Sequence, residues 1–230
     1  MKFNVVSALS SFAMLGLLGL AGVVIATSDT YTSERAQNRV FGSAKAMRVQ
    51  AGVSNALLHF DLEYLPENTR GAHVGRALLR LNVLRVRKPG TVAVRRVDET
   101  WDEDSVSASS SPYLGPVVLD GYPVHREQQR EWIDLDVTDL VRDWVDGNVP
   151  NHGLAIVPVG DVRVDFASKE SKRAVAPELD VILVGGGGGS SGAGAPGPMG
   201  PQGPPGPRGP EGERGPRAAH RWGHRDRLAL

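Results

Sequence analysis

The chain has 230 residues, of which 26 are basic and 26 acidic, so its formal net charge at neutral pH is zero. A balanced charge points to neither nucleic acid nor an acidic polymer as the partner of the whole chain. The sequence contains no cysteine, which excludes a disulfide-stapled scaffold. The fold must therefore rest on a hydrophobic core.

Residues 1–26 are typical of a secretory signal peptide. Lys2 supplies the positive start, residues 12–25 are apolar, and Val24-Ile25-Ala26 fits cleavage after Ala26. An uncleaved membrane anchor is the alternative, but the apolar run is shorter than the roughly 20 residues that span a bilayer. We expect a secreted, extracellular protein with no membrane span once the signal is removed.

Residues 27–184 alternate between apolar and polar side chains over many short segments, and this alternation is typical of β-strands. The clearest segments are 55–62, 76–86, 90–97, 131–135, 153–159, 162–168 and 178–184. Turn signals such as Pro89-Gly90 and Asp120-Gly121 separate them. The pattern predicts an all-β domain, either a β-sandwich or a barrel.

One segment, residues 136–148, has a helical period instead. It places five apolar residues on one face, namely Val137, Leu140, Val141, Trp144 and Val145. Asp136 can cap the first turn, and Gly147 is placed to end the helix. We expect one short helix that closes an end of the sandwich, with Trp144 as a core residue rather than a ligand platform.

The order of several short motifs resembles the DNRLRE domain, a family related to the family 96 carbohydrate-binding modules and to disaggregatase-type repeats. The motifs are "DTY" at 29–31, "MRV" at 47–49, "LLHFDLEYLP" at 57–66, "ALLRLNV" at 77–83, "VDETWDEDSV" at 97–106, "WIDLDVTDLVRDWVDG" at 132–147, "HGLAI" at 152–156, "FASKE" at 166–170 and "PELDV" at 177–181. The resemblance covers nearly all of residues 28–184. It implies a jelly-roll β-sandwich that acts as an adhesive or sugar-binding module of exported proteins.

A basic set of side chains is the first candidate binding surface. We expect two strands joined at Pro89-Gly90 to form a hairpin that gathers Arg80, Arg85, Arg87, Arg95 and Arg96. Guanidinium groups bind carboxylates through paired hydrogen bonds, so this face would suit an anionic polysaccharide, with Tyr113 and Tyr122 as stacking surfaces. The alternative is a solvated strand face whose arginines pair with nearby acids.

Acidic side chains suggest a calcium site, because Ca²⁺ prefers oxygen ligands. Asp102 and Asp104 lie in the acidic run 97–106, and Asp29 and Asp180 could meet across adjacent strands near the ends of the domain. The alternative for the acidic run is a solvated loop around a buried Trp101. No other cofactor is expected.

Catalysis finds little support in the sequence. It has no GxSxG elbow, no HExxH pair, no phosphate-binding loop and no cysteine nucleophile. We therefore expect a protein that is not an enzyme, although acidic pairs leave a polysaccharide-cleaving activity as a weaker alternative.

The last part of the chain changes composition. Residues 185–193 form a Gly/Ser-rich linker, residues 194–217 carry glycine at every third position, and residues 218–230 form a basic tail. Only glycine fits the axis of a collagen triple helix, so the repeat predicts a collagen-like stalk and a homotrimer. The leading hypothesis is a non-catalytic extracellular binding or matrix protein, and a purely structural trimerising scaffold is its rival.

Overall fold

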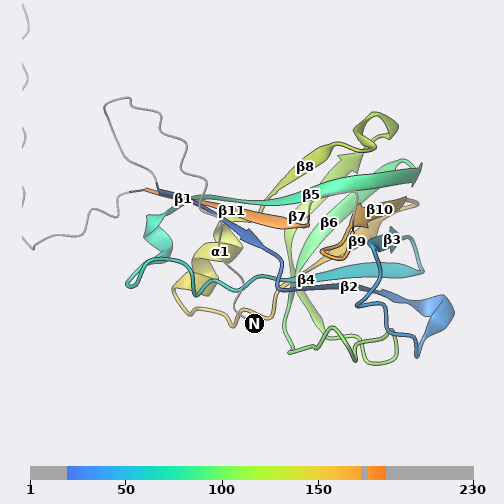
Figure 1. Ribbon diagram of the computed structural model, residues 1–230, viewed down its shortest axis with the longest axis horizontal. Helices are drawn as coiled ribbons and strands as arrows, with labels where there is room; N and C mark the ends of the chain where they lie inside the picture. The colour runs from blue at the N-terminus through green and yellow to red at the C-terminus, as the bar shows by residue number, and fades with distance from the viewer. Residues whose placement is uncertain (1–19, 172–175, 185–230) are drawn as a thin grey trace, which may run out of the picture. The chain divides into compact units, whose positions relative to one another are not determined.

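The computed structural model of the protein describes residues 20–171 and 176–184. In these residues the fold consists of eleven strands, one α-helix and three short 3-10 turns (Figure 1). The strands are β1 (Leu20–Ile25), β2 (Ser28–Ser33), β3 (Ala46–Gln50), β4 (Ser54–His59), β5 (Val74–Lys88), β6 (Gly90–Val97), β7 (Leu114–Val124), β8 (Trp132–Asp136), β9 (Leu154–Val159), β10 (Arg163–Ala167) and β11 (Glu178–Leu183). The helix α1 is Thr138–Val145, and the 3-10 turns are Glu34–Ala36, Gly71–His73 and Arg126–Gln128.

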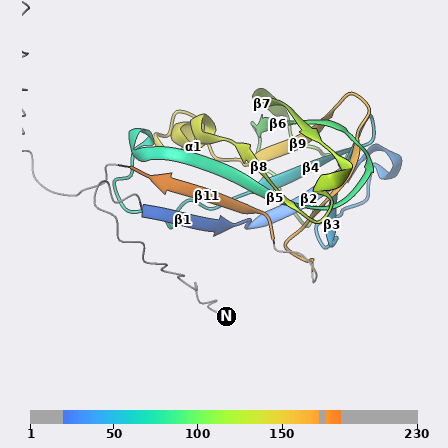
Figure 2. The ribbon, with the colours of Figure 1, turned by 90° about the horizontal axis from the view of Figure 1, so that it is seen from above.

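The long strand β5 organises one layer. Its first half pairs on one side with β11, which pairs in turn with β1, and on the other side with β8. Its second half pairs with β10, which pairs with β3. Figure 2 shows β1, β11 and β5 side by side. Every pair in this layer is antiparallel.

The second layer has the strand order β2, β4, β9, β6 and β7, again with antiparallel pairs. A tight turn between β3 and β4, with the single paired contact between Gln50 and Ser54, carries the chain from one layer to the other. The sheet therefore curls around its own core.

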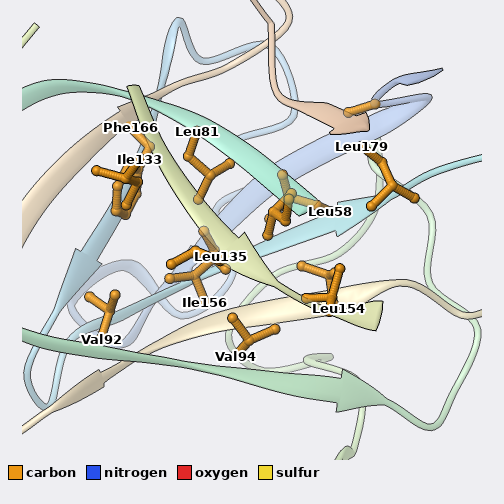
Figure 3. Close-up of a cluster of buried hydrophobic side chains, with 14 of the residues drawn as sticks. Leu58, Leu81, Val92, Val94, Ile133, Leu135, Leu154, Ile156, Phe166 and Leu179 are labelled. Atoms are coloured by element: carbon orange, nitrogen blue, oxygen red, sulfur yellow. The ribbon is translucent and has the colours of Figure 1, made fainter. Parts of the chain in front are cut away.

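The core fills the space between the layers. Its largest fully buried side chains come from both layers, and ten core residues are labelled in Figure 3: Leu58, Leu81, Val92, Val94, Ile133, Leu135, Leu154, Ile156, Phe166 and Leu179. Full burial of one such aliphatic or aromatic side chain contributes about 1.5 to 3 kcal/mol. This core takes the place of the disulfides that the chain lacks.

A smaller apolar cluster lies on the outer side of the second layer. Leu57, Val97 and Ala155 face away from the main core and are covered by Val106 and Trp101 of the loop between β6 and β7. The Trp101 indole N–H donates to the carbonyl of His152 at 2.9 Å. The acidic run thus belongs to a loop that is anchored to the sheet by a half-buried Trp101.

Helix α1 has the predicted apolar face, but the N-cap position is Val137 and Asp136 lies one residue before it. Leu140, Val141 and Trp144 are buried, and Trp144 is part of the main core. The carboxylate of Asp136 accepts hydrogen bonds from the backbone N–H of Thr138 at 3.0 Å and from its hydroxyl at 2.6 Å. Gly147 ends the helix with a φ of +70°, which is the conformation that glycine adopts without strain.

The prediction of an all-β domain with one short helix is confirmed for the described residues. The predicted hairpin between β5 and β6 is wrong, because β6 pairs with β7 and β9 in the second layer. The Pro89-Gly90 turn therefore changes layers instead of folding one strand back on the other. Strand β1 also lies within the predicted signal peptide, of which residues 1–19 are outside the described residues.

The predicted linker at 185–193, collagen-like repeat at 194–217 and basic tail at 218–230 also lie outside the described residues. Within the part of the chain that the structure describes, no helix is long and apolar enough to cross a membrane.

Candidate functional site

Four of the five predicted arginines are held by contacts within the domain, and three of them are Arg80, Arg95 and Arg96. Arg80 pairs with Asp134 at 3.3 Å and with Glu178 at 3.1 Å, and its guanidinium lies 5.1 Å from the centre of the Trp132 ring. Arg95 donates to the carbonyls of Leu114 and Gly115, and Arg96 pairs with Asp98. Since β5 and β6 are in different layers, the structure does not assemble these residues with Arg85 and Arg87 as one hairpin face.

Arg87 belongs to a different arrangement, centred on Asp165 of β10. The two carboxylate oxygens of Asp165 accept hydrogen bonds from Nε of Arg48 at 3.1 Å and from Nε of Arg87 at 3.0 Å. Asp165 is buried, whereas the two arginine side chains are each about a third exposed (36% and 35%). Arg85 is exposed and stands opposite Asp165 in the register of β5 and β10.

Aromatic rings continue this arrangement beyond β3. Tyr31 and Phe41 stack with ring centres 4.2 Å apart and planes 24° apart. The guanidinium of Arg48 lies 5.8 Å from the Tyr31 ring, and that of Arg39 lies 5.1 Å from the Phe41 ring. Burial raises the pKa of the Tyr31 phenol, although Arg48 opposes this effect, so the phenol is neutral near pH 7.

We call the resulting surface the guanidinium–aromatic band. It comprises Arg39, Phe41, Tyr31, Arg48, Asp165 and Arg87. Sequence reasoning found Arg87 but missed the others, because they come from β2, the loop before β3, β3 and β10. The alternation of Arg48 with Met47 and Val49 was the available signal, since it places the arginine on the outer face of β3.

The two predicted stacking tyrosines lie near opposite ends of β7. Tyr113 precedes the strand and is 66% exposed, and its backbone N–H bonds to Glu99. Tyr122, near the far end, is half-buried, and its hydroxyl accepts a hydrogen bond from Gln128 at 3.2 Å. They do not form a joint platform.

The predicted calcium ligands are separated in the structure. Asp102 and Asp104 are exposed in one turn, where the Asp102 carboxylate accepts from the Asp104 backbone N–H. Asp180 is paired in register with Val23 and Leu78. The expected meeting of Asp29 with Asp180 is not found, because β1 occupies the place beside β11 and β2 lies along β4 instead.

Asp29 lies instead in a cluster with Glu103, Lys169 and Glu170. One carboxylate oxygen from each of the three acids lies within 4.8 Å of the others, and Lys169 Nζ contacts Glu103 at 2.8 Å and also Glu170. Burial raises the pKa of Asp29 to about 7. The backbone N–H of Lys169 opposes this shift, and the charges of Glu170 and Glu103 reinforce it. Burial also raises the pKa of Glu103. It would lower the pKa of Lys169, but the hydrogen bonds to the two glutamates outweigh it and raise that pKa.

A groove beside helix α1 is the other candidate binding surface. It is lined by residues from the start of β5, the middle of β7 and the first turns of α1, among them Arg76, Val118 and Arg142. The Arg142 guanidinium donates to the Val74 carbonyl and to Asp139. Among the described residues no aromatic side chain lines the groove, whereas the band brings guanidinium groups next to the half-buried Phe41 ring.

Comparison with known proteins adds one family. Residues 22–182 match the profile of Carbohydrate-binding module family 96. The matched range includes β2 to β10, the last four residues of β1 and all but the last residue of β11, and therefore the whole guanidinium–aromatic band. No curated protein matches the chain.

Proposed function

The chain belongs to carbohydrate-binding module family 96, and on this premise we propose that its β-sandwich binds an anionic polysaccharide through the guanidinium–aromatic band. The observation that carries the proposal is the continuous contact from Arg39 through Phe41, Tyr31 and Arg48 to Asp165 and Arg87. It places partly exposed guanidinium groups beside the half-buried Phe41 ring, with Tyr31 buried beneath them as part of the core.

The arginines of the band retain hydrogen-bonding capacity for a ligand. Each guanidinium has five N–H donors, and the bonds from Arg48 and Arg87 to Asp165 both use Nε. Within the described residues, the terminal N–H groups of both side chains form no other hydrogen bond, so they can bind carboxylate or sulfate groups in pairs. The exposed Arg39 and the half-buried Phe41 extend this surface toward solvent.

The test is a binding titration of the folded chain with a polyuronate, a sulfated polysaccharide and a neutral glucan. The double variant Arg48→Ala plus Arg87→Ala should weaken polyanion binding tenfold or more, and added salt should weaken wild-type binding. Arg80→Ala is the matched control, because Arg80 lies on the same strand as Arg87, has similar exposure (33%) and forms ion pairs of its own. Equal losses in both variants, or binding indifferent to salt, would contradict the proposal.

We further propose that the protein is secreted, is not an enzyme, and carries this DNRLRE-type head on a collagen-like stalk that gathers three chains. The support is in the sequence: a signal-like start, the absence of a catalytic motif, and glycine at every third position from Gly194 to Gly215. Three weak sites held together would bind a polymer more tightly through effective concentration.

Turnover of the same polysaccharides, abolished by changing one acidic residue, would favour the enzyme alternative. Folding and trimerisation without any retention on polysaccharide would favour the scaffold alternative.

A further inference from the structure

Four separate segments of the chain meet around Asp29. Asp29 is in β2, Glu103 is in the loop after β6, and Lys169 and Glu170 are in the turn after β10. The loop before β3 closes the arrangement, because a Cβ atom on Gly42 would lie only 2.5 Å from the carbonyl oxygen of Glu103. Side chains at this junction can therefore form contacts between loops that are not joined by strand pairing.

Two carboxylate oxygens at this junction are buried without a hydrogen-bond partner among the described residues. Asp29 is fully buried (0% exposed), and while its Oδ2 accepts from the backbone N–H of Lys169 at 2.7 Å, its Oδ1 has no donor. Oε2 of Glu170 is buried and unpartnered in the same way. Buried polar atoms are nearly always satisfied, so each of these two oxygens calls for a specific explanation.

The charges at the junction are also unbalanced. Three carboxyl groups surround one ammonium group, and the ammonium contacts Glu103 and Glu170. With all four groups ionised, the cluster carries two negative charges in a largely buried position, which is costly unless a cation compensates them or Asp29 takes up a proton.

We infer that Asp29, Glu103 and Glu170 form a binding site for one divalent cation of the calcium type. Carboxylate oxygens are the ligands that Ca²⁺ prefers, at 2.3–2.6 Å from the ion. Oxygen atoms within 4.8 Å of one another can share one such ion, because ligands on opposite sides of it lie about 4.6 to 5.2 Å apart. The Lys169 ammonium competes for two of the same carboxylates, and its partly exposed side chain (27%) can move toward solvent when the ion binds.

The test uses the full chain, freed of metal with a chelator and titrated with CaCl₂. Calorimetry should show saturable binding of about one ion per chain, and the melting temperature should rise by roughly 5 to 10 °C at 100 times the dissociation constant. MgCl₂ should bind at least tenfold more weakly. Asp29→Asn should abolish binding, whereas Asp104→Asn, which removes an exposed carboxylate from the adjacent turn, should leave it unchanged.

Lys169→Met keeps the test decisive if Asp29→Asn fails to fold. This variant removes the competing ammonium, so it should bind Ca²⁺ at least threefold more tightly than the wild type and regain stability on Ca²⁺ addition. No saturable Ca²⁺ binding in either the wild type or Lys169→Met would overturn the inference and leave Lys169 as the cation of the cluster. Full affinity in a folded Asp29→Asn variant would also overturn it.

Discussion

Asp165 on β10 and Arg48 on β3 are joined by a hydrogen bond of 3.1 Å, although 116 residues separate them in the chain. The same carboxylate binds Arg87 on the other side, so one buried acid holds the arginines of two flanking strands in place. Asp165→Asn removes the charge while it keeps the shape of the side chain. We expect a loss of about 1 to 3 kcal/mol in the free energy of unfolding, because charge-assisted bonds become neutral ones.

Polyanion binding by Asp165→Asn should be no weaker than in the wild type, because the variant adds one net positive charge to the band. Chemical denaturation and the binding titration give the two readouts. A folded variant that loses polyanion binding would mean that the alignment of the two guanidinium groups matters more than their charge.

Gly153 and Gly147 form a matched pair for testing the packing between β4 and β9. Both have positive φ, +85° and +70°, so alanine at either position costs about 1 to 2 kcal/mol in backbone strain. A Cβ atom at Gly147 meets nothing within 4 Å, whereas one at Gly153 would lie 2.1 Å from the carbonyl oxygen of Leu58. Gly153→Ala should therefore destabilise the domain at least twice as much as Gly147→Ala. Equal melting temperatures would show that β9 can shift away from β4 without cost.

The start of helix α1 gives a pH-dependent prediction. The Asp136 pKa is lowered by hydrogen bonds from the Thr138 hydroxyl and backbone N–H. A lowered pKa means that the folded state favours the ionised form, so this stabilisation is present above the pKa of the unfolded chain, near 3.9, and is lost as the pH falls through the folded-state pKa. Asp136→Ala should lose about 1 kcal/mol at pH 7, where the carboxylate accepts both hydrogen bonds, and progressively less as the pH falls below about 3.9.

Asp136→Asn is the control for the ionic part of this effect, because its side-chain carbonyl can accept the same two hydrogen bonds from Thr138 without a charge. It should keep most of the stability at pH 7 and lack the acid-dependent change. The comparison is made by urea denaturation of the three proteins across the pH range. A constant difference between wild type and Asp136→Ala at all pH values would contradict the prediction.

The assembly state tests the collagen-like repeat. Each glycine of a triple helix faces the crowded axis, so one bulky replacement disrupts all three chains. Gly206→Val lies near the middle of the repeat and should dissociate the trimer, whereas Gly194→Val at its start should be milder. Sedimentation at low temperature distinguishes the two. A monomeric wild type would mean that the repeat is only an extended linker. A trimer unaffected by Gly206→Val would mean that the β-sandwich head, not the repeat, drives assembly.

The strands and the helix could be predicted from the sequence because their signals are local. Alternation identified the strands around residues 55–59, 76–86 and 178–183, and a 3.6-residue period identified α1. Strand pairing is not local. The sequence Pro89-Gly90 indicates a turn in either case: the next strand can pair with the previous one or enter the other layer. Only the packing of the whole core decides between these two arrangements.

The functional residues show the same limit. The expected hairpin with the preceding strand places Arg95 on a ligand-binding face, but irregular pairing with β7 leaves the Leu114 and Gly115 carbonyls to accept hydrogen bonds from Arg95. Arg48 and Asp165 meet only because β3 and β10 are neighbours. The charge of Asp29 suggests a calcium ligand, but its partners Glu103 and Glu170 lie in loops. Sequence periodicity does not indicate which loops lie close together.

The pairing of β1 with β11 gives the processing of the chain a structural consequence. Ala26, after which we predict cleavage, is buried, and its N–H donates to the Pro177 carbonyl at 2.9 Å. A peptidase that cuts there must act before this part of the domain closes, and the cut removes the whole six-residue ladder between β1 and β11. In the cut chain β11 becomes an outer strand whose unpaired backbone groups can accept a strand from another molecule. Retention or removal of β1 would thus decide whether the outer edge of β11 is paired or open.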